Sequence, residues 1–77
     1  MKNHSFYKYA LTFRGGPVSD KMAMFAEAMF YDLSFPKQSN DFEEISSYIE
    51  ELAHSDMSAT IFDEMWLLFE TNVAFRQ

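Results

Sequence analysis

The sequence contains no cysteine, only two glycines and two prolines, and no long hydrophobic run. The absence of cysteine excludes disulfide bonds and thiolate chemistry. So few glycines and prolines are atypical of linkers and disordered chains, so a folded chain is expected. The N-terminal stretch lacks the apolar core of a signal peptide, and no later segment approaches the roughly 18 apolar residues of a membrane span. We therefore expect a soluble, cytoplasmic protein that does not act at a membrane.

Aromatic residues are what this short chain has in abundance. A chain of 77 residues forms one domain at most and buries only about 60% of its unfolded surface. Apolar residues make up 48% of it and aromatic residues 18%, with nine phenylalanines. Each large ring buries roughly 150 to 250 Å². We therefore expect a single domain over residues 1–77, with an ordered core over about 5–76 and rings at its centre.

The net charge of −6 is distributed unevenly. Residues 1–37 hold five Lys and Arg against three Asp and Glu, a net charge of +2. Residues 38–77 hold one Arg against nine Asp and Glu, a net charge of −8. A polyanion would be repelled by the acidic half, so any contact with nucleic acid would be confined to the first half.

Two helices are expected in the first half. Ser5 is a suitable N-cap for a helix over 5–14, which the Gly-Gly-Pro sequence after it ends. A second helix begins near Ser19 or Asp20 and extends to about residue 33. Apolar residues at steps of three and four predict that this second helix is buried on two sides: Met22, Met24, Phe25, Ala26, Ala28, Met29, Tyr31 and Leu33.

Two further helices are expected in the second half. Asn40 and Thr60 are each followed three positions later by an acidic residue, the pattern of a capping box. Asn40 would open a helix over 41–53, and Thr60 a final helix that runs to about residue 75 and crosses the core. The expected buried faces are Phe42, Ile45, Tyr48, Ile49 and Leu52 in the first, and Ile61, Phe62, Met65, Trp66, Leu68, Phe69 and Val73 in the second.

Phe35 stands in the turn between the second and third helices. Pro36 restricts its backbone towards extended geometry, so the segment over 32–40 is expected to be an ordered turn. A large ring in such a turn either anchors it in the core or belongs to a binding surface. We predict that Phe35 is buried between the helices over 20–33 and 60–75.

Four short segments lie in order along nearly the whole chain: "SFYKY" at 5–9, "SFPKQSND" at 34–41, "EISSYIE" at 44–50 and "FDEMW" at 62–66. Together they resemble the YozE-like family of small bacterial proteins. The resemblance implies a compact all-α fold of four to five helices, similar to the sterile alpha motif (SAM) domain. A fifth, short helix would lie around residues 55–59. The family has no established activity, so the resemblance implies no catalytic residues.

A search for catalytic or metal-binding patterns finds none that is convincing. His54, Ser55 and Asp56 are residue types of a hydrolase triad, but adjacent positions do not produce triad geometry. Glu50 and His54 could face one metal, yet two ligands are too few, and the other histidine, His4, is near the terminus. Neighbouring carboxylates on a helix point about 100° apart. We therefore expect no enzyme activity, no cofactor, no metal and no small-molecule substrate.

Aromatic, methionine and tryptophan side chains are expected to fill the core. Tyr7, Tyr9 and Phe13 alternate with basic residues as in single-strand binding proteins, but helical spacing favours burial of Tyr9 and Phe13. Trp66 is expected in the core with its indole nitrogen near the rim. Core filling is likewise favoured over an adaptable binding surface for five methionines: Met22, Met24, Met29, Met57 and Met65.

The function that the sequence favours is a non-enzymatic interaction module. The opposite charges of the two halves favour a protein partner or head-to-tail self-association, which salt would weaken. The alternative is nucleic-acid binding through the basic first half. The two hypotheses differ in whether four basic residues converge on one face: Lys8, Arg14, Lys21 and Lys37.

Overall fold

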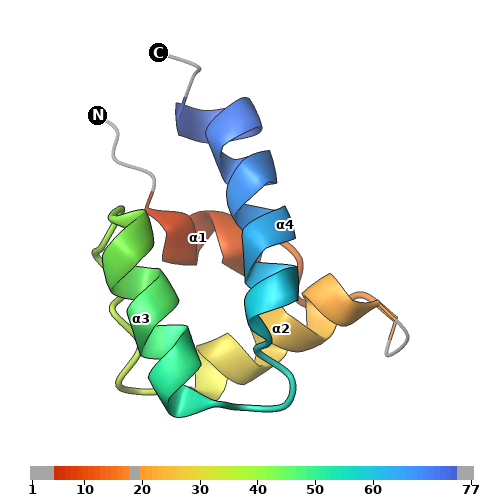
Figure 1. The fold of residues 1–77 in the computed structure, drawn as a ribbon. Helices are drawn as coiled ribbons and strands as arrows, with labels where there is room; N and C mark the ends of the chain where they lie inside the picture. The colour runs from red at the N-terminus through yellow and green to blue at the C-terminus, as the bar shows by residue number, and fades with distance from the viewer. Residues whose placement is uncertain (1–4, 18–19, 75–77) are drawn as a thin grey trace.

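The fold consists of four α-helices and a short π-helical extension. The computed structural model describes residues 5–17 and 20–74. In these ranges no strand is present, and the elements are α1 (Phe6–Leu11), α2 (Lys21–Tyr31), α3 (Phe42–Leu52), α4 (Ala59–Phe69) and η1 (Glu70–Ala74). Figure 1 shows α4 running past the other three helices. The expected all-α class and its four main helices are confirmed.

Each helix begins at a side chain that accepts hydrogen bonds from its first turn. Ser5 caps α1 and Asp20 caps α2, as predicted, while Ser19 lies outside the described residues. Asp41 caps α3, so the predicted cap Asn40 is wrong by one position. Ser58 caps α4, so the predicted cap Thr60 is wrong by two positions. Both true caps have extended backbone with a side-chain oxygen near the N–H groups of the first turn, which is the geometry a cap requires.

The two residues that were expected to cap have other positions. Asn40 lies before the helix, and its Oδ1 accepts a hydrogen bond of 2.9 Å from the backbone N–H of Phe6, 34 residues away. Thr60 is inside the first turn of α4, because that helix begins at Ala59. A long-range hydrogen bond at Asn40 and a helix start two residues earlier than expected at α4 therefore replaced two plausible local patterns.

The helix ends depart from the sequence expectations in ways that shape the turns. After Leu11 the chain continues to residue 14 in tight turns, in which Phe13 and Arg14 donate to carbonyls three residues earlier. Gly15 then has φ +90°, which a residue with a Cβ rarely adopts. α3 ends with Ala53 at φ 53°, a left-handed conformation for a non-glycine residue. Residues 55–57 form a turn and bend, so the optional fifth helix around 55–59 is not formed.

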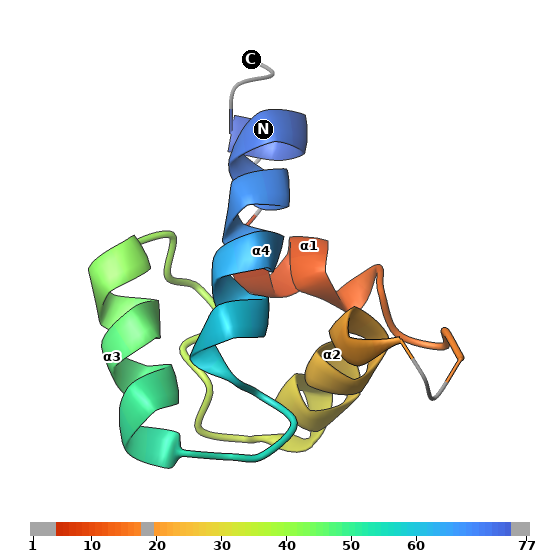
Figure 2. The ribbon, with the colours of Figure 1, turned by 45° about the vertical axis from the view of Figure 1, so that its right-hand side comes forward.

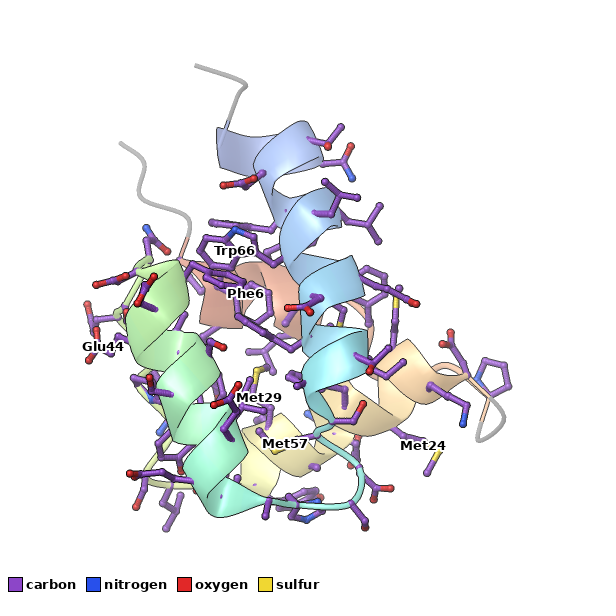
Figure 3. The ribbon with its side chains drawn as sticks, viewed as in Figure 1. Phe6, Met24, Met29, Glu44, Met57 and Trp66 are labelled. Atoms are coloured by element: carbon purple, nitrogen blue, oxygen red, sulfur yellow. The ribbon has the colours of Figure 1, made fainter. Side chains whose placement is uncertain are left out.

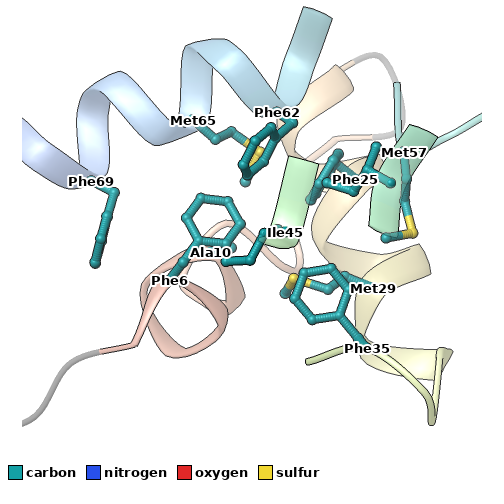
Figure 4. Close-up of a cluster of buried hydrophobic side chains, with 11 residues drawn as sticks. Phe6, Ala10, Phe25, Met29, Phe35, Ile45, Met57, Phe62, Met65 and Phe69 are labelled. Atoms are coloured by element: carbon teal, nitrogen blue, oxygen red, sulfur yellow. The ribbon is translucent and has the colours of Figure 1, made fainter. Parts of the chain in front are cut away.

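α4 is the helix around which the core is built. It contacts α1, α2 and α3. In the rotated view of Figure 2 it stands between α3 on the left and α1 and α2 on the right. The predicted burial of Phe62, Met65 and Phe69 is confirmed, while the side chain of Val73 lies outside the described residues. Figure 4 shows the cluster that results, whose members are Phe6, Ala10, Phe25, Met29, Phe35, Ile45, Ile49, Met57, Phe62, Met65 and Phe69.

Burial of α2 on two sides is wrong. Phe25 and Met29 face the core, but the opposite side of the helix is open. Met24 is 37% exposed and Tyr31 69% exposed, and Leu33, beyond the helix end, is 85% exposed. α1 and α4 contact this helix, and its other side borders an open hollow whose far wall is Leu52 at the end of α3.

Phe35 is buried, as predicted, with 4% of its surface exposed. Its ring lies 5.7 Å from that of Tyr7 on α1 and 5.6 Å from that of Tyr48 on α3, centroid to centroid. Figure 4 also places it beside Met29 of α2. The aromatic neighbours of Phe35 are therefore on α1 and α3, which the prediction did not name, and the ring shares one buried cluster with α2 and α4.

A tyrosine and an aspartate fix the turn that carries Phe35. The Tyr48 hydroxyl donates a hydrogen bond to Asp32 Oδ2, while Asp32 Oδ1 accepts from the backbone N–H of Ser34. The carbonyl of Asp32 accepts from the N–H of Phe35. Burial of the phenol, together with this hydrogen bond to Asp32, raises the pKa of Tyr48 to about 12. The turn is therefore held from both its backbone and its side chains.

Truncation of Phe35 should destabilise the protein substantially. We expect Phe35→Ala to lower the free energy of unfolding by about 3 kcal/mol or more, the usual cost of removing a buried ring. Lys37→Ala, two residues away and exposed, should change it by no more than about 0.5 kcal/mol. Chemical denaturation of the two variants and the parent measures both. Equal stability of Phe35→Ala and parent would contradict the anchoring role.

The Tyr48 hydrogen bond should produce a loss of stability at alkaline pH. The pKa of the Tyr48 hydroxyl is about 12 in the folded state against an ordinary value of 10.0. The hydrogen bond therefore contributes fully to the free energy of unfolding below pH 10.0, and this contribution is lost as the pH rises to about 12. In the Tyr48→Phe variant this part of the alkaline loss should be missing. Absorbance titration of tyrosinate in the parent should show one late ionisation that the variant lacks. A variant that retains the late ionisation would show that another tyrosine is responsible.

Candidate functional site

Two of the four candidate basic residues are brought together. Lys8 of α1 and Lys37 of the turn line one open hollow of about 630 Å³ with Tyr7, and Lys37 Nζ lies 5.7 Å from the Tyr7 ring centroid. We call this the lysine hollow; its other polar lining residues are Ser5, Gln38 and Asn40.

Arg14 is engaged within the molecule. Its Nε donates to Glu27 Oε1 at 2.9 Å and its Nη2 donates to Glu27 Oε2 at 3.1 Å, a two-pronged ion pair between the end of the α1 region and α2. Its guanidinium carbon lies 3.7 Å from the Phe30 ring centroid. The hydrogen bonds raise the pKa of Arg14 and lower that of Glu27. This cation is therefore held between a carboxylate and a ring.

Lys21 lies in a different place. It lines a smaller hollow of about 190 Å³ with Met24 of α2, Ser58 before α4, and Ile61 of α4. This hollow shares no residue with the lysine hollow. The four basic residues thus divide into one pair, one engaged arginine and one separate lysine.

A second surface, which the sequence analysis interpreted as buried, runs along the open side of α2. Met24, Ala28 and Tyr31 occupy positions i, i+4 and i+7 of the helix and form an apolar wall, opposite Leu52 at the end of α3. Figure 3 shows Met24 pointing away from Met29 and the core. We call this hollow of about 480 Å³ the α2 groove; its polar rim is Glu27, Asp32, His54 and Asp56.

The signal for the α2 groove was present in the sequence but was interpreted as burial. Eight apolar residues of the α2 region cover more of the helix circumference than one neighbouring layer can bury. Met29, Met57 and Met65 do fill the core as predicted, whereas Met24 does not. An excess of apolar positions on a helix therefore predicts either two neighbours or an open face, and α2 has the open face.

The remaining aromatic predictions agree with the structure in their main point. Tyr9, Phe13 and Trp66 are partly buried and pack against the core cluster. The Trp66 ring lies 5.6 Å from that of Phe6, centroid to centroid, as Figure 3 illustrates. Packing rather than base stacking therefore accounts for most of their ring surface.

The catalytic residue types considered above do not assemble into a reactive geometry in the described ranges. His54 Nδ1 accepts a hydrogen bond of 3.0 Å from the backbone N–H of Asp56, which closes an exposed turn. No group of three or more potential metal ligands gathers among the described residues, and His4 lies outside them. Within the same ranges, no helix is long and apolar enough to cross a membrane.

Comparison with known proteins identifies the family. Residues 5–71 match the model of a family described as "YozE SAM-like fold". Relatives named "UPF0346 protein" occur in Oenococcus oeni (45% identity, covering 90% of this chain and 91% of the relative), Leuconostoc mesenteroides (45%; 87% and 89%) and Bacillus cereus (49%; 84% and 90%). The fold is thus that of an all-α, SAM-like domain. The chain belongs to the YozE SAM-like family.

The four segments that carry the family resemblance meet in space. The ring of Phe35 packs between Tyr7 of the first segment and Tyr48 of the third. The Phe6 ring lies 5.2 Å from that of Phe62 in the fourth, centroid to centroid. These segments therefore form the centre of the fold, and the first two also provide the walls of the lysine hollow.

Zinc should not bind the acidic part of the chain. Glu50 and His54 provide two ligands at most, and the described residues supply no third beside them. Zinc at micromolar concentrations should therefore leave the backbone amide signals of residues 50–54 unchanged in nuclear magnetic resonance spectra. Saturable shifts there that a chelator reverses would overturn this expectation.

Proposed function

We propose that this protein is a non-enzymatic protein-interaction module that binds its partner in the α2 groove. The observation that carries the proposal is the apolar wall of Met24, Ala28 and Tyr31, in which Met24 is 37% and Tyr31 69% exposed. Contiguous apolar surface on a small domain is typical of interaction sites. The buried core cluster includes neither Met24 nor Tyr31, while Ala28 packs against its edge. Their apolar character is therefore available for a partner.

The partner that fits this groove is an amphipathic helix with basic flanks. α2 has 11 residues and is about 16 Å long, which matches a partner helix of about three turns. Side chains at i, i+4 and i+7 on α2 suit a facing helix with the same spacing. The rim contributes Asp32 and Asp56, and the half of the chain after residue 37 has a net charge of −8. Basic residues beside the apolar stripe would complement these charges.

The polar groups of the groove support binding rather than catalysis. Glu27 is paired with Arg14, and Asp32 accepts hydrogen bonds from Tyr48 and Ser34. These carboxylates thus already have structural roles.

We further propose that the module works in the cytoplasm, which the location of a fluorescent fusion would test.

Nucleic-acid binding is the weaker candidate function. This hypothesis requires four basic side chains to converge on one face. Lys8 and Lys37 share a hollow, but Arg14 is paired with a carboxylate and Lys21 lines a different hollow. Affinity for nucleic acid depends on the number of phosphates that are neutralised. Two neighbouring lysines on a molecule of net charge −6 would give little affinity.

A designed peptide tests the proposed function. The probe is a blocked 12-residue peptide of leucine and lysine, with leucine at helical spacing; the control is a scrambled peptide of the same composition. The helical peptide should shift the amide signals of residues 24–31 and 52–56, and the scrambled one should not. Replacing Met24 and Tyr31 together by alanine should weaken binding about tenfold or more, because both side chains would be buried by the partner.

A matched variant controls for general stickiness. Leu67→Ala removes a side chain that is 64% exposed on α4, outside the groove, and should leave the affinity unchanged. Equal binding of helical and scrambled peptides, or equal losses in the groove and Leu67 variants, would refute the α2 groove as the site.

A further inference from the structure

The lysine hollow combines positive charge with a surplus of hydrogen-bond donors. Two of its side-chain acceptors are already in use: Ser5 Oγ accepts from the backbone N–H of Lys8 at 3.2 Å, and Asn40 Oδ1 accepts from that of Phe6 at 2.9 Å. With its oxygen occupied, the Asn40 amide presents its two N–H donors, and each lysine presents a donor-only ammonium group. The hollow is therefore built to receive acceptor atoms.

The charges in the hollow are not balanced from within the described part of the molecule. There the ion pair that forms is Arg14 with Glu27, and neither Lys8 nor Lys37 lies within 4.0 Å of a carboxylate oxygen. Twelve carboxylates against six Lys and Arg would make such pairing easy to arrange. Two like charges that line one hollow, neither of them paired with a carboxylate of the described residues, offer an attractive site for an external anion.

We propose that the lysine hollow binds an acidic peptide segment, with carboxylates placed between Lys8 and Lys37. An extended segment brings two or three negative charges into the hollow and keeps the rest of its backbone outside it. A nucleic acid would extend its charged backbone well beyond the hollow, towards the first turn of α3, where Glu43 and Glu44 repel it. A second copy of the chain would offer pairs of neighbouring carboxylates on α3 and α4, which point about 100° apart on a convex helix. The geometry thus favours a separate acidic segment.

This site is independent of the α2 groove. The two share no lining residue, and they prefer partners of opposite charge. A module with both sites could hold a basic helix and an acidic segment at once, either from two proteins or from one. Linked binding of this kind raises the overall affinity without new contacts.

Blocked hexaglutamate is the probe for the acidic segment, and blocked hexaglutamine is its uncharged control. Hexaglutamate should produce saturable amide shifts in residues 5–8 and 37–40 that weaken at high salt, and hexaglutamine should not. The double variant Lys8→Gln, Lys37→Gln should lose at least tenfold in affinity. Lys21→Gln changes a charge outside the hollow and should leave the affinity within twofold of the parent.

Each other outcome overturns the proposal. Absence of saturable shifts in these residues, or an equal effect of Lys21→Gln, would exclude the hollow as the site. Stronger binding of a six-nucleotide single strand at the same residues would identify nucleic acid instead. Concentration-dependent shifts of the protein alone, together with a dimer in sedimentation, would identify a second copy. Circular dichroism of each variant establishes that it is folded. If hexaglutamate does not bind the lysine hollow, the leucine–lysine peptide test of the α2 groove is unaffected.

Discussion

Packing of the Phe6 ring against α4 holds the first helix in place. The centroid of this ring lies within 5.8 Å of those of Phe62, Trp66 and Phe69. α1 has six residues, and isolated helices shorter than about 12 to 15 residues are marginal in water, so its stability depends on such contacts. The hydrogen bond from the Phe6 backbone to Asn40 attaches the turn before α3 at the same point. Phe6 therefore connects the beginning of the described chain with its middle and with its last α-helix. The residues on both sides of Phe6, Ser5 and Tyr7, line the lysine hollow together with Asn40.

Local patterns predicted the elements of the fold well because its helices carry their own signals. The caps Ser5 and Asp20 depend on neighbours within one turn, and these expectations are confirmed. The expected buried stripe of α3 is confirmed at Ile45 and Ile49 but is wrong at its two ends, where Phe42 is 38% and Leu52 37% exposed. Tertiary contacts were beyond such signals. Periodicity shows that a side chain is apolar but not which neighbour covers it, so the burial of Phe35 was predicted while its aromatic neighbours were not. The ion pair that engages Arg14 spans 13 residues and a turn, and no pattern in the sequence announces it.

The two proposed surfaces differ in how they are prepared for binding. The α2 groove is a wall of exposed side chains on a regular helix, whereas the lysine hollow depends on a turn that brings distant residues together. That turn is held by the hydrogen bonds of Asp32 with Tyr48 and by the burial of Phe35. Lys37 follows two residues later, so its backbone is already positioned before a ligand arrives. Pre-organisation of this kind lowers the entropic cost of binding.

Ala53 shows how the α2 groove is connected to the stability of the domain. Its left-handed backbone, at φ 53°, turns the chain out of α3 and directs His54 and Asp56 over α2, where they form the rim. For a residue with a Cβ this conformation costs roughly 1 to 2 kcal/mol. A domain of this length has a net stability of roughly 4 to 12 kcal/mol, at about 0.05 to 0.15 kcal/mol per residue. The conformation of this one residue therefore costs a noticeable fraction of the net stability. In return it sets the direction of the loop, so backbone strain and the shape of the groove's edge are linked.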